Sequence, residues 1–460
     1  MRILQVIHQF PPHSSQGSEL HCQQLSRYFR DHGDAVGVFH LSNFKPRHPK
    51  RLLQYDQDGL NIFHCIDGGQ YSRQADWPNF YLRKSFSRAL DIFQPDLVHF
   101  HHYLSLGDGL VRLAKTKTRG IVYTLHDFGL LCPNEHLLRD QGGLCEKATP
   151  DFFEACCPTR IRSNRGVRPG IIAQLPPLER WREFAAHQSG SCRRALMQAT
   201  VKVAEKILGR PESRRFEDKK SFFLSSTRQI IHDVDQFLAP SNFLLERFIA
   251  CGIPQDKIIH LRYGMTHFPV KSPAESHDKK LRFGYIGAFH PHKGIDLLLS
   301  AFQGLGAHAS LHLHGSSFAS PVSEAYLQQI TSQSMKGVVL HGPYDNREIG
   351  DILSSLDAII VPSRWYENSP LTIQEAQIAR VPVITAGVGG MAELVRDGID
   401  GLHFRCNDAI DLHRVLRSLI DSPAQLHKLR THIPKVPTVE EQAHQVRQLY
   451  QDLFSQQGAP

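Results

Sequence analysis

The stretch DAIIVPSRWYENSPLTIQEAQIARVPVIT, residues 357–385, contains the pattern on which the fold prediction rests. It opens with an apolar run, 358–361, whose length and β-branching are typical of a buried parallel strand. After a polar turn, Ser369 and Pro370 have the pattern of a helix start, with serine as N-cap and proline in the first turn. A helical segment and a second β-branched run complete residues 371–385. The stretch therefore predicts a strand–helix–strand unit.

Two carboxylates flank the start of this predicted helix. Glu367 lies in the turn before it, and Glu375 lies eight positions later, about two helical turns on. A helix N-terminus presents free N–H groups and the positive end of its dipole, which suit a phosphate or diphosphate. A carboxylate is a good acceptor for paired sugar hydroxyls. Although either glutamate alone is more typical of a surface residue, the pair around Asn368 favours a nucleotide-sugar site.

With this pair, the chain resembles the retaining glycosyltransferases of family 4. Their signature is two glutamates separated by seven residues, followed by a strand of small residues and a loop with two glycines, which Gly389 and Gly390 supply here. The resemblance covers most of the chain and is weakest over residues 128–222. It implies an α/β protein of GT-B fold, with two doubly wound Rossmann-like domains facing across a cleft and a C-terminal helix crossing back to the first domain.

Length and composition agree with two domains. At 460 residues the chain exceeds what one hydrophobic core usually organises, and its apolar fraction of 41% suffices for packed α/β cores. We predict an acceptor-side domain over 1–268, with a cysteine-containing basic insertion at about 128–222, and a nucleotide-sugar-binding domain over 269–437. The last segment, 438–460, has apolar residues at helical spacing and is expected to pack back on the first domain.

Histidines follow two predicted strands of a parallel sheet in the first domain. One strand ends at His99, His101 and His102, and the next ends at His126 and Asp127. Ligands of open parallel sheets bind beyond the carboxyl ends of the strands, so these histidines are well placed. A metal site at His99 and His101 is not expected, because no third ligand is evident. The resemblance implies that His126 faces the donor sugar and its phosphate, while Asp127 either orients it or caps the following turn.

The resemblance also implies a set of site residues. The predicted catalytic residues are His126 and Glu367, and the predicted donor-binding residues are Gly17, Lys293, Asn368, Ser369, Pro370, Leu371 and Glu375. Glu375 would bind the ribose hydroxyls and Glu367 those of the sugar. The diphosphate would lie against the backbone at 368–371 and the compact charge of Lys293. Such donors stabilise the departing diphosphate without a metal ion, so we expect no cofactor.

The predicted function is that of a retaining, metal-independent glycosyltransferase of hexosyltransferase type. It would move a sugar from a nucleoside-diphosphate sugar to a hydroxyl of a glycan, lipid-linked or small-molecule acceptor, as in polysaccharide biosynthesis. No convincing side-chain nucleophile is evident, which fits same-face attack by the acceptor through an oxocarbenium-like transition state.

One position departs from the family pattern and keeps other functions open. Where the family has an arginine directly after the first glycine of the second domain, this chain has Ala288 after Gly287. His290, His292 or Arg364 could replace that cation. One alternative is therefore a catalytically impaired sugar-nucleotide-binding or scaffold protein of the same fold. Another is an inverting GT-B transferase or a sugar-nucleotide epimerase, which needs a positioned carboxylate or histidine base.

The net charge of +8 is unevenly distributed. Residues 160–220 carry fifteen Lys and Arg against six Asp and Glu, and a second basic loop spans 45–51. Such patches suit an anionic membrane surface or a lipid phosphate, or are simply a solvated helical face. Nucleic acid is not an expected partner, because neither an aromatic ladder nor zinc-finger spacing is present. Without an 18-residue apolar span or a signal peptide, we expect a cytoplasmic protein, free or in peripheral contact with the inner face of the membrane.

Two further patterns were weighed as metal sites. Cys132, Cys145, Cys156 and Cys157 cluster in one irregular segment, and four thiolates can bind zinc or an iron–sulfur centre. Adjacent Cys156 and Cys157 do not form a C-x-x-C chelate, however, so incidental thiols are favoured. The triplet at 233–235, Asp-Val-Asp, has the form that binds a divalent ion in the GT-A fold, but it precedes a predicted buried strand. We therefore expect no metal at either position.

Overall fold

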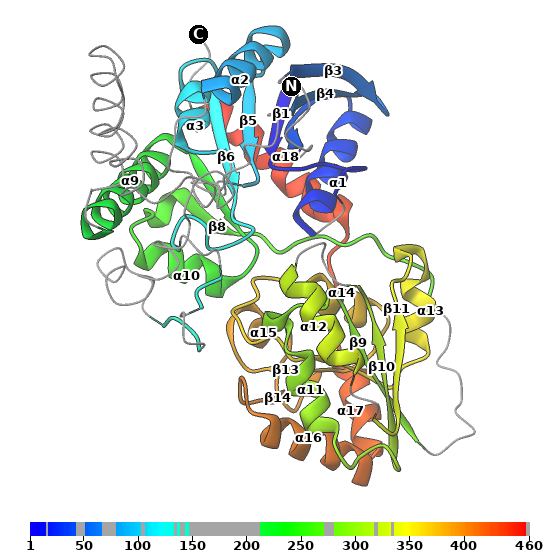
Figure 1. Cartoon of the computed structure of the whole chain (residues 1–460). Helices are drawn as coiled ribbons and strands as arrows, with labels where there is room; N and C mark the ends of the chain where they lie inside the picture. Colours follow the sequence, from blue (N-terminus) through cyan, green and yellow to red (C-terminus); the bar gives the residue numbers. More distant parts are fainter. Residues whose placement is uncertain are drawn as a thin grey trace, which may run out of the picture.

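The computed structural model describes residues 1–14, 17–42, 51–66, 80–102, 106–132, 136–138, 143–146, 212–270, 280–316, 321–332 and 335–456. Figure 1 shows two α/β bodies, each built around its own sheet and joined by extended chain. Most of the predicted insertion, residues 147–211, lies outside the described residues. Among the helices described, none is long and apolar enough to cross a membrane.

The first body has an eight-stranded sheet in the order β3-β4-β2-β1-β5-β6-β7-β8. Its strands are β1 (Arg2–Ile7), β2 (Ala35–Ser42), β3 (Arg51–Gln57), β4 (Leu60–Ile66), β5 (Leu97–Phe100), β6 (Gly120–Thr124), β7 (Gln236–Ala239) and β8 (Ile258–His260). Its helices are α1 (Gly17–Asp31), α2 (Phe80–Phe93), α3 (Asp108–Lys115), α9 (Glu212–Asp233), α10 (Asn242–Ala250) and the short η2 (Gln255–Lys257). All neighbouring strands pair in parallel except β3 and β4.

The antiparallel strand β3 departs from the parallel sheet that the sequence analysis predicts. Asp58 and Gly59 connect β3 to β4 and have φ angles of 54° and 77°, in the left-handed region. An Asp-Gly pair favours such a tight hairpin, because glycine adopts this region without strain and aspartate tolerates it better than most residues. Arg51, the last residue of the predicted basic loop, is the first residue of β3, and residues 45–50 lie outside the described part of the chain.

The second body has a six-stranded, fully parallel sheet in the order β11-β10-β9-β12-β13-β14. Its strands are β9 (Leu281–Ile286), β10 (Ala309–His314), β11 (Val338–Gly342), β12 (Ala358–Val361), β13 (Val383–Ala386) and β14 (Gly401–Phe404). Its helices are η3 (Pro291–Lys293), α11 (Ile295–Phe302), α12 (Pro321–Thr331), η4 (Asn346–Glu348), α13 (Ile349–Ser354), α14 (Leu371–Ile378), α15 (Gly389–Leu394), α16 (Ala409–Asp421) and α17 (Ala424–His432). The chain order reverses between β9 and β12, and ligands of open parallel sheets bind at such a point.

The unit predicted from residues 357–385 is present as β12, α14 and β13, and β12 pairs in parallel with β13. The predicted serine N-cap is wrong, however. Pro370, with an extended ψ of 122°, is the N-cap of α14 and makes no side-chain cap. Ser369 instead accepts a hydrogen bond on Oγ from Gln374 Nε2 at 3.3 Å. Because Pro370 itself has extended backbone, the helix begins at Leu371, one residue later than the serine suggests.

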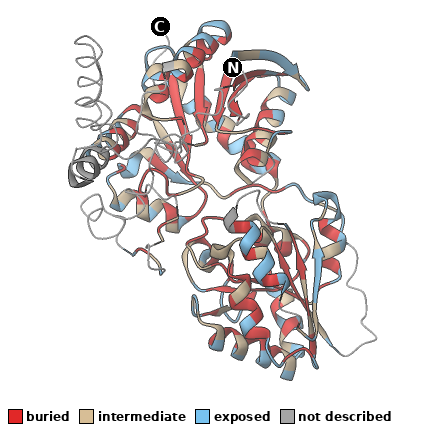
Figure 2. Cartoon of the chain, in the orientation of Figure 1, coloured by how far each residue is buried: buried red, intermediate tan, exposed pale blue. Residues whose placement is uncertain are grey.

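Buried residues concentrate in the strands of both sheets (Figure 2). Each body has its own apolar core, and a separate apolar cluster lies on the α1 side of the first sheet. That cluster includes Ile3 and Phe29 together with Val446 and Tyr450 from the last helix, α18 (Val439–Gln456). The C-terminal helix therefore crosses back to the first body, as predicted, and the fold class is confirmed. The domain boundaries themselves stay predictions.

Polar contacts also hold α18 against the first sheet. The Arg447 guanidinium contacts the Asp34 carboxylate, with Nε 2.7 Å from Oδ2. Asp34 also pairs with the amino group of Met1, so the two ends of the chain share one acidic side chain. The Tyr450 hydroxyl lies 2.5 Å from His99 Nδ1, and both side chains are fully buried.

We predict that Tyr450→Ala lowers the free energy of unfolding by about 3–5 kcal/mol, because it leaves a cavity where a buried aromatic ring packs. Tyr450→Phe is expected to cost about 1–3 kcal/mol, because it removes the hydroxyl and leaves buried His99 Nδ1 unpaired. Tyr55→Phe, on the exposed face of β3, is the control and should change stability by less than about 0.5 kcal/mol. Urea unfolding of the three variants measures this, and equal effects of all three would refute the docking of α18.

Candidate active site

The predicted site residues of the second body lie in two loops at the carboxyl ends of β9 and β12. The loop after β9 leads to Lys293 at the end of η3, and the loop after β12 contains Glu367 and Asn368. Because β9 and β12 are neighbours at the point where the strand order reverses, the two loops lie side by side. Gly294 makes this approach possible: a Cβ there would lie 2.2 Å from the carbonyl oxygen of Pro362.

Glu367 is buried, with a relative exposure of 7%, and its carboxylate is held by three donors. Lys293 Nζ lies 2.6 Å from Oε1, Ser363 Oγ 2.7 Å and Trp365 Nε1 2.9 Å. All three contacts fall on Oε1, and no side chain in the described part of the molecule is recorded as donating to Oε2. Such anchoring fixes the carboxylate in one orientation and leaves its second oxygen available as an acceptor.

Lys293 and Glu367, which the sequence analysis assigns to different parts of a donor, therefore form one ion pair. The lysine side chain is 25% exposed and the glutamate side chain 9% exposed, so the carboxylate is more shielded from solvent than the ammonium group. The Lys293 ammonium also lies 5.4 Å from the centre of the Trp365 ring, within range of a cation–π interaction.

Asn368 connects the two bodies. Its Nδ2 donates to the backbone carbonyl of His126 at 2.6 Å, and its buried Oδ1 has no hydrogen-bond partner in the described structure. The double-glycine loop lies directly beneath it, because a Cβ on Gly390 would lie 1.7 Å from the Asn368 carbonyl oxygen, while Gly390 N donates to Glu367 O at 2.8 Å. The loop thus fixes the turn that carries both side chains, which gives a physical reason for the two glycines.

The other predicted donor-binding residues lie at the start of α14. Ser369, Pro370 and Leu371 lead into this helix, and the first N–H groups of a helix have no partner within it. Gly17, the first residue of α1, lies opposite: a Cβ there would lie 3.3 Å from Leu371 Cδ1. The N-termini of α1 and α14 are therefore close together, and Gly17 provides room between them.

His126 lies at the edge of the first body and is half-buried. Its Nδ1 is 2.5 Å from the Tyr263 hydroxyl and its Nε2 is 3.0 Å from His101 Nδ1. Burial, followed by repulsion from His21, holds the pKa of His126 well below its usual value, so the ring is neutral near pH 7. Asp127 does not orient it. The Asp127 carboxylate accepts from Gly129 N at 2.6 Å and pairs with His102, which supports the capping alternative.

Glu375 lies on α14, one turn from its start, and is half-buried without the donors that surround Glu367. Burial raises the pKa of Glu375 to about 7. Burial, and secondarily the Glu375 charge, also raise the pKa of the Tyr344 hydroxyl, which places the two side chains close together. The two glutamates therefore differ in environment: Glu367 is paired with a cation, and Glu375 is desolvated.

The three groups considered as replacements for a cation at Ala288 differ in charge. Burial, then the neighbouring Lys293 charge, lowers the pKa of His292 far below its usual range, so this ring is neutral. His290 caps η3 through its side chain, which accepts from His292 N. Arg364 is charged and pairs with Asp296 at 2.7 Å, while its buried Nε has no hydrogen-bond partner among the residues that the structure describes. Arg364 is thus the remaining candidate.

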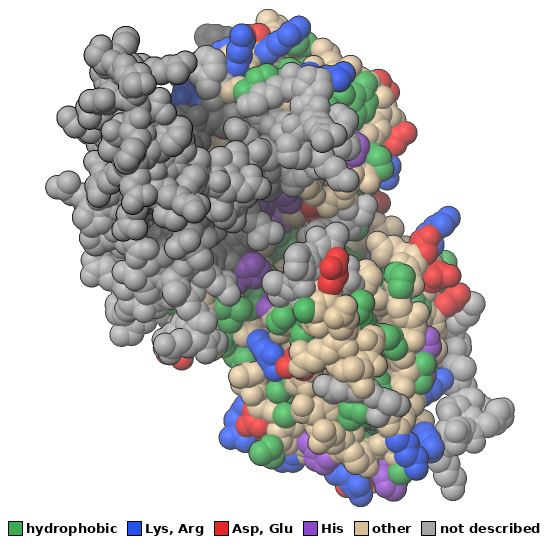
Figure 3. All heavy atoms as spheres, viewed as in Figure 1, with side chains coloured by type: hydrophobic (Ala, Val, Ile, Leu, Met, Phe, Trp, Pro, Cys, Tyr) green, Lys and Arg blue, Asp and Glu red, His purple; other side chains and the backbone are tan. Residues whose placement is uncertain are grey.

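Several residues near the site were missed from the sequence. Ser363 and Trp365 lie in the turn before α14, close to Glu367 in the sequence. This closeness in sequence could have identified them as neighbours of Glu367. Tyr263 and His21 had no such signal, since they come from a segment after β8 and from α1. Figure 3 shows histidine side chains (purple) where the two bodies meet.

Asp233, Asp235 and four cysteines are among the residues considered above as possible metal ligands. Asp235 accepts from Ile121 N at 2.9 Å and from Lys115 Nζ at 2.6 Å, and Asp233 accepts from Gln229 at 2.8 Å. Both carboxylates therefore support local structure. Cys132 and Cys145 are buried in the first core, whereas Cys156 and Cys157 lie outside the described residues.

Solved structures share this architecture over nearly the whole chain. A sucrose-phosphate synthase from Thermosynechococcus elongatus is 17% identical and has a TM-score of 0.62, covering 98% of this chain and 99% of that one. Anabaena Alr3699/HepE, in complex with UDP and glucose, is 14% identical and has a TM-score of 0.61, with the same coverage. The fold is therefore that of the GT-B glycosyltransferases.

Family models identify the chain further. A model described as Glycosyl transferases group 1 matches residues 270–436, and one described as Glycosyltransferase Family 4 matches residues 15–147. Together they account for more than half of the chain, which belongs to the group 1 glycosyltransferases.

Curated relatives match over parts of their length. An uncharacterized 41.2 kDa protein in the cps region of Klebsiella pneumoniae is 24% identical over 208 residues, which are 44% of this chain and 56% of that protein. D-inositol 3-phosphate glycosyltransferase 1 of Catenulispora acidiphila is 38% identical over 88 residues, 19% of this chain and 21% of that protein. The chain therefore spans about half of the first relative and about a fifth of the second.

Glu375 should make the ligand-free protein less stable at alkaline pH. Its pKa is raised from 4.5 to about 7 in the folded state, so the stability it contributes is fully present below pH 4.5 and is lost as the pH rises through 7. We predict that Glu375→Gln is more stable than the unmodified protein at pH 8 by at least about 1 kcal/mol, since one pKa unit corresponds to about 1.4 kcal/mol.

Thermal unfolding without ligand at pH 8 and pH 5 measures this difference, which should largely disappear at pH 5. Glu324→Gln, on the exposed face of α12, is the control and should have no pH-dependent effect. An advantage of Glu375→Gln that is the same at both pH values would contradict the raised pKa.

Proposed function

We propose that the protein is a retaining, metal-independent glycosyltransferase that moves a hexose from a nucleoside-diphosphate sugar to a hydroxyl acceptor. The observation that carries the proposal is the anchored Glu367 carboxylate at the start of α14, paired with Lys293 and lying beside the contact between Asn368 and His126. It brings together a cation, a fixed acceptor and a helix N-terminus, which suit the phosphate and hydroxyl groups of such a donor.

The diphosphate would lie at the N-terminus of α14. The N–H groups of Leu371 and Thr372 precede the first hydrogen bond of this helix, in which Ile373 N donates to Pro370 O at 3.1 Å. Lys293, which pairs with Glu367 in the turn before this helix, would add a positive charge. As the bond to the sugar breaks, negative charge grows on the diphosphate, and preorganised donors stabilise that charge more than they stabilise the bound donor.

Glu367 would hold the sugar. With Oε1 occupied by three donors, Oε2 is the oxygen that would accept from a sugar hydroxyl. The anchoring matters because a fixed acceptor orients the sugar without losing side-chain entropy on binding. Retention would follow from attack by the acceptor hydroxyl on the face from which the diphosphate leaves, since Glu367 is tied to Lys293 and is poorly suited to be a nucleophile.

Glu375 would hold the ribose of the donor. Its ionised carboxylate can accept hydrogen bonds from two adjacent hydroxyls, whereas the protonated form offers fewer acceptor positions. Because hydrogen bonds to the charged form lower a pKa, a bound ribose would favour the ionised state of Glu375.

His126 would contact the donor sugar from the other body. Both ring nitrogens already have partners, so Nδ1 must release Tyr263, or Nε2 must release His101, before the ring can donate to a ligand. The neutral ring suits such a role near a growing positive charge on the sugar, because it adds no repulsion.

The proposed classes of donor and acceptor rest on the chemistry of the candidate site and on similarity to other proteins. The structure of Anabaena Alr3699/HepE with UDP and glucose supports a UDP-hexose donor. A glycan or lipid-linked acceptor, as in polysaccharide biosynthesis, is part of the same proposal. We place the protein in the cytoplasm, with the basic residues at 160–220 as its contact to an anionic membrane. The acceptor-side, donor-side and terminal units at 1–268, 269–437 and 438–460 are part of this proposal.

We predict that Glu367→Gln lowers kcat/KM for transfer or donor hydrolysis by about 100-fold or more, because loss of about 3 kcal/mol of transition-state stabilisation corresponds to that factor. Glu324→Gln is again the matched control and should leave the rate unchanged. The assays should contain a chelator, so that the measured rate requires no divalent ion. A protein that binds the UDP-sugar without transfer or hydrolysis would instead be the impaired or scaffold form.

Retention is tested separately. NMR of the first product formed from an α-linked donor should show an α-linkage, since same-face attack keeps the configuration. A β-linked product would exclude this mechanism and indicate an inverting transferase, which needs a positioned base.

A further inference from the structure

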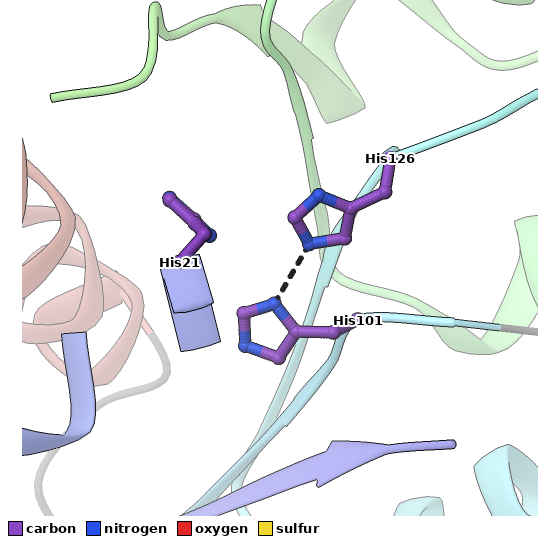
Figure 4. Close-up of side chains that lie close together, drawn as sticks. All are labelled: His21, His101 and His126. Carbon is purple, nitrogen blue, oxygen red and sulfur yellow. Dashed lines mark hydrogen bonds between the residues drawn. The ribbon is translucent and has the colours of Figure 1, made fainter. Parts of the chain in front are cut away.

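Three histidines from separate elements lie around a common point (Figure 4). His21 comes from α1, His101 follows β5 and His126 follows β6. The centres of their rings are 5.3 Å apart for His101 and His126, 5.3 Å for His21 and His126, and 5.9 Å for His21 and His101. Among the histidines, the sequence analysis considers a metal site only at His99 and His101. His99 does not belong to this group, because its two nitrogens contact Tyr450 and Thr124, and the ligands beside His101 come from α1 and from the end of β6.

One nitrogen of each ring is turned toward the others. His101 Nδ1 and His126 Nε2 are 3.0 Å apart, and one nitrogen from each of the three rings lies within 4.8 Å of the other two. In His21, Nε2 is bound to Gln442, which leaves Nδ1 as the inward nitrogen. That atom is buried and has no hydrogen-bond partner in the described structure. Nδ1 of His21 is therefore an unsatisfied polar atom, and its burial costs free energy.

The outer nitrogen of each ring is bound to an oxygen. His21 Nε2 lies 3.1 Å from Gln442 Oε1, and His101 Nε2 lies 2.7 Å from Gln5 Oε1. His126 Nδ1 lies 2.5 Å from the Tyr263 hydroxyl. Metal-binding histidines typically have their second nitrogen held by an oxygen in this way, because the outer contact fixes the ring and its tautomer.

We propose that His21, His101 and His126 bind a divalent transition-metal ion, with Zn²⁺ as the best-fitting ion, through His21 Nδ1, His101 Nδ1 and His126 Nε2. Imidazole nitrogen is a good ligand for zinc, and three histidines leave one position of a tetrahedral ion to a ligand from outside the chain. With the ion on His126 Nε2 and Tyr263 on Nδ1, neither nitrogen of this ring is left for the donor sugar, so the ion and the sugar would compete for His126. The binding of the ion itself does not depend on the proposed activity.

The ring positions agree with such an ion. For zinc–nitrogen distances of about 2.0–2.1 Å, tetrahedral ligands have nitrogens about 3.3 Å apart and ring centres about 5 Å apart. The observed ring separations lie close to this value, and the 3.0 Å contact between His101 and His126 is nearly correct. Binding would require the proton that these two nitrogens share to move to His126 Nδ1, where the Tyr263 oxygen can accept it, and a small inward shift of His21.

The test is Zn²⁺ binding to tag-free, chelator-treated full-length protein, followed by competition with a chromophoric chelator. We expect one Zn²⁺ per chain. His21→Gln should weaken the affinity by at least the tenfold that loss of an outer partner typically causes, and Tyr263→Phe by about tenfold. His341→Gln is the matched control, because it removes a histidine from another histidine group, that of His312 and His314, and should leave the affinity unchanged.

Two further measurements separate a loss of the site from a loss of the fold. Zn²⁺ should raise the melting temperature of the unmodified protein but not that of His21→Gln, since an ion that binds only the native state stabilises it. Co²⁺ in place of Zn²⁺ should give the visible absorption of a tetrahedral site, and the His21→Gln spectrum should lack it. Equal Zn²⁺ affinity in His21→Gln and the unmodified protein, or no Zn²⁺ binding by the latter, would overturn the proposal.

Discussion

The buried carboxylate of Glu367 is the constraint around which the second body is arranged. Burial of an unpaired carboxylate costs several kcal/mol, so a cation and further donors must reach it. Lys293, Ser363 and Trp365 do so from the loops after β9 and β12. These loops meet only because the two strands are neighbours, and they approach closely because Gly294 has no side chain. The order of strands in the sheet therefore determines the chemistry at its edge.

Contacts between the two bodies cluster around the same loop. Asn368 donates to the His126 carbonyl, and Arg262 contacts Gln374 and Gln377 of α14 at 3.1 Å and 2.7 Å. The Glu393 carboxylate of α15 accepts from the backbone N–H groups at the start of α10, a position that also favours a negative charge. Apolar contacts accompany them, because Tyr366 of the second body belongs to the core cluster of the first and its ring centre lies 4.9 Å from that of Phe243. Both kinds of contact therefore hold the turn that carries Glu367 and Asn368 against the first body.

The parts of the fold that the sequence predicted well are those with a local signal. The apolar run of β12 and the helical spacing of α18 lie where they were expected, because burial and periodicity are visible over a few residues. Predictions failed where a local conformation or a side-chain contact depends on other residues, adjacent or distant in the sequence. Ser369 does not cap α14, because Pro370 has extended backbone and the helix begins only at Leu371. The pairing of Lys293 with Glu367 could not be predicted from residues far apart in the sequence, since it depends on the strand order. His21 was missed for the same reason: its partners lie in other elements, and only the packing of α1 on the sheet brings them together.

The two glutamates of the family signature, Glu367 and Glu375, are both shielded from solvent but differ in their partners. Glu367 is paired within the protein, so its orientation is set before any ligand arrives. Glu375 lacks a cation partner in the described structure, and burial alone raises its pKa to about 7. A paired carboxylate is rigid and suits the positioning of a reacting sugar. The charged form of a desolvated carboxylate has a high free energy, which hydrogen bonds from a ligand with two hydroxyls can lower. In the proposed function, the first glutamate would contribute geometry and the second affinity, so the spacing between them would separate orientation of the sugar from recognition of the nucleotide.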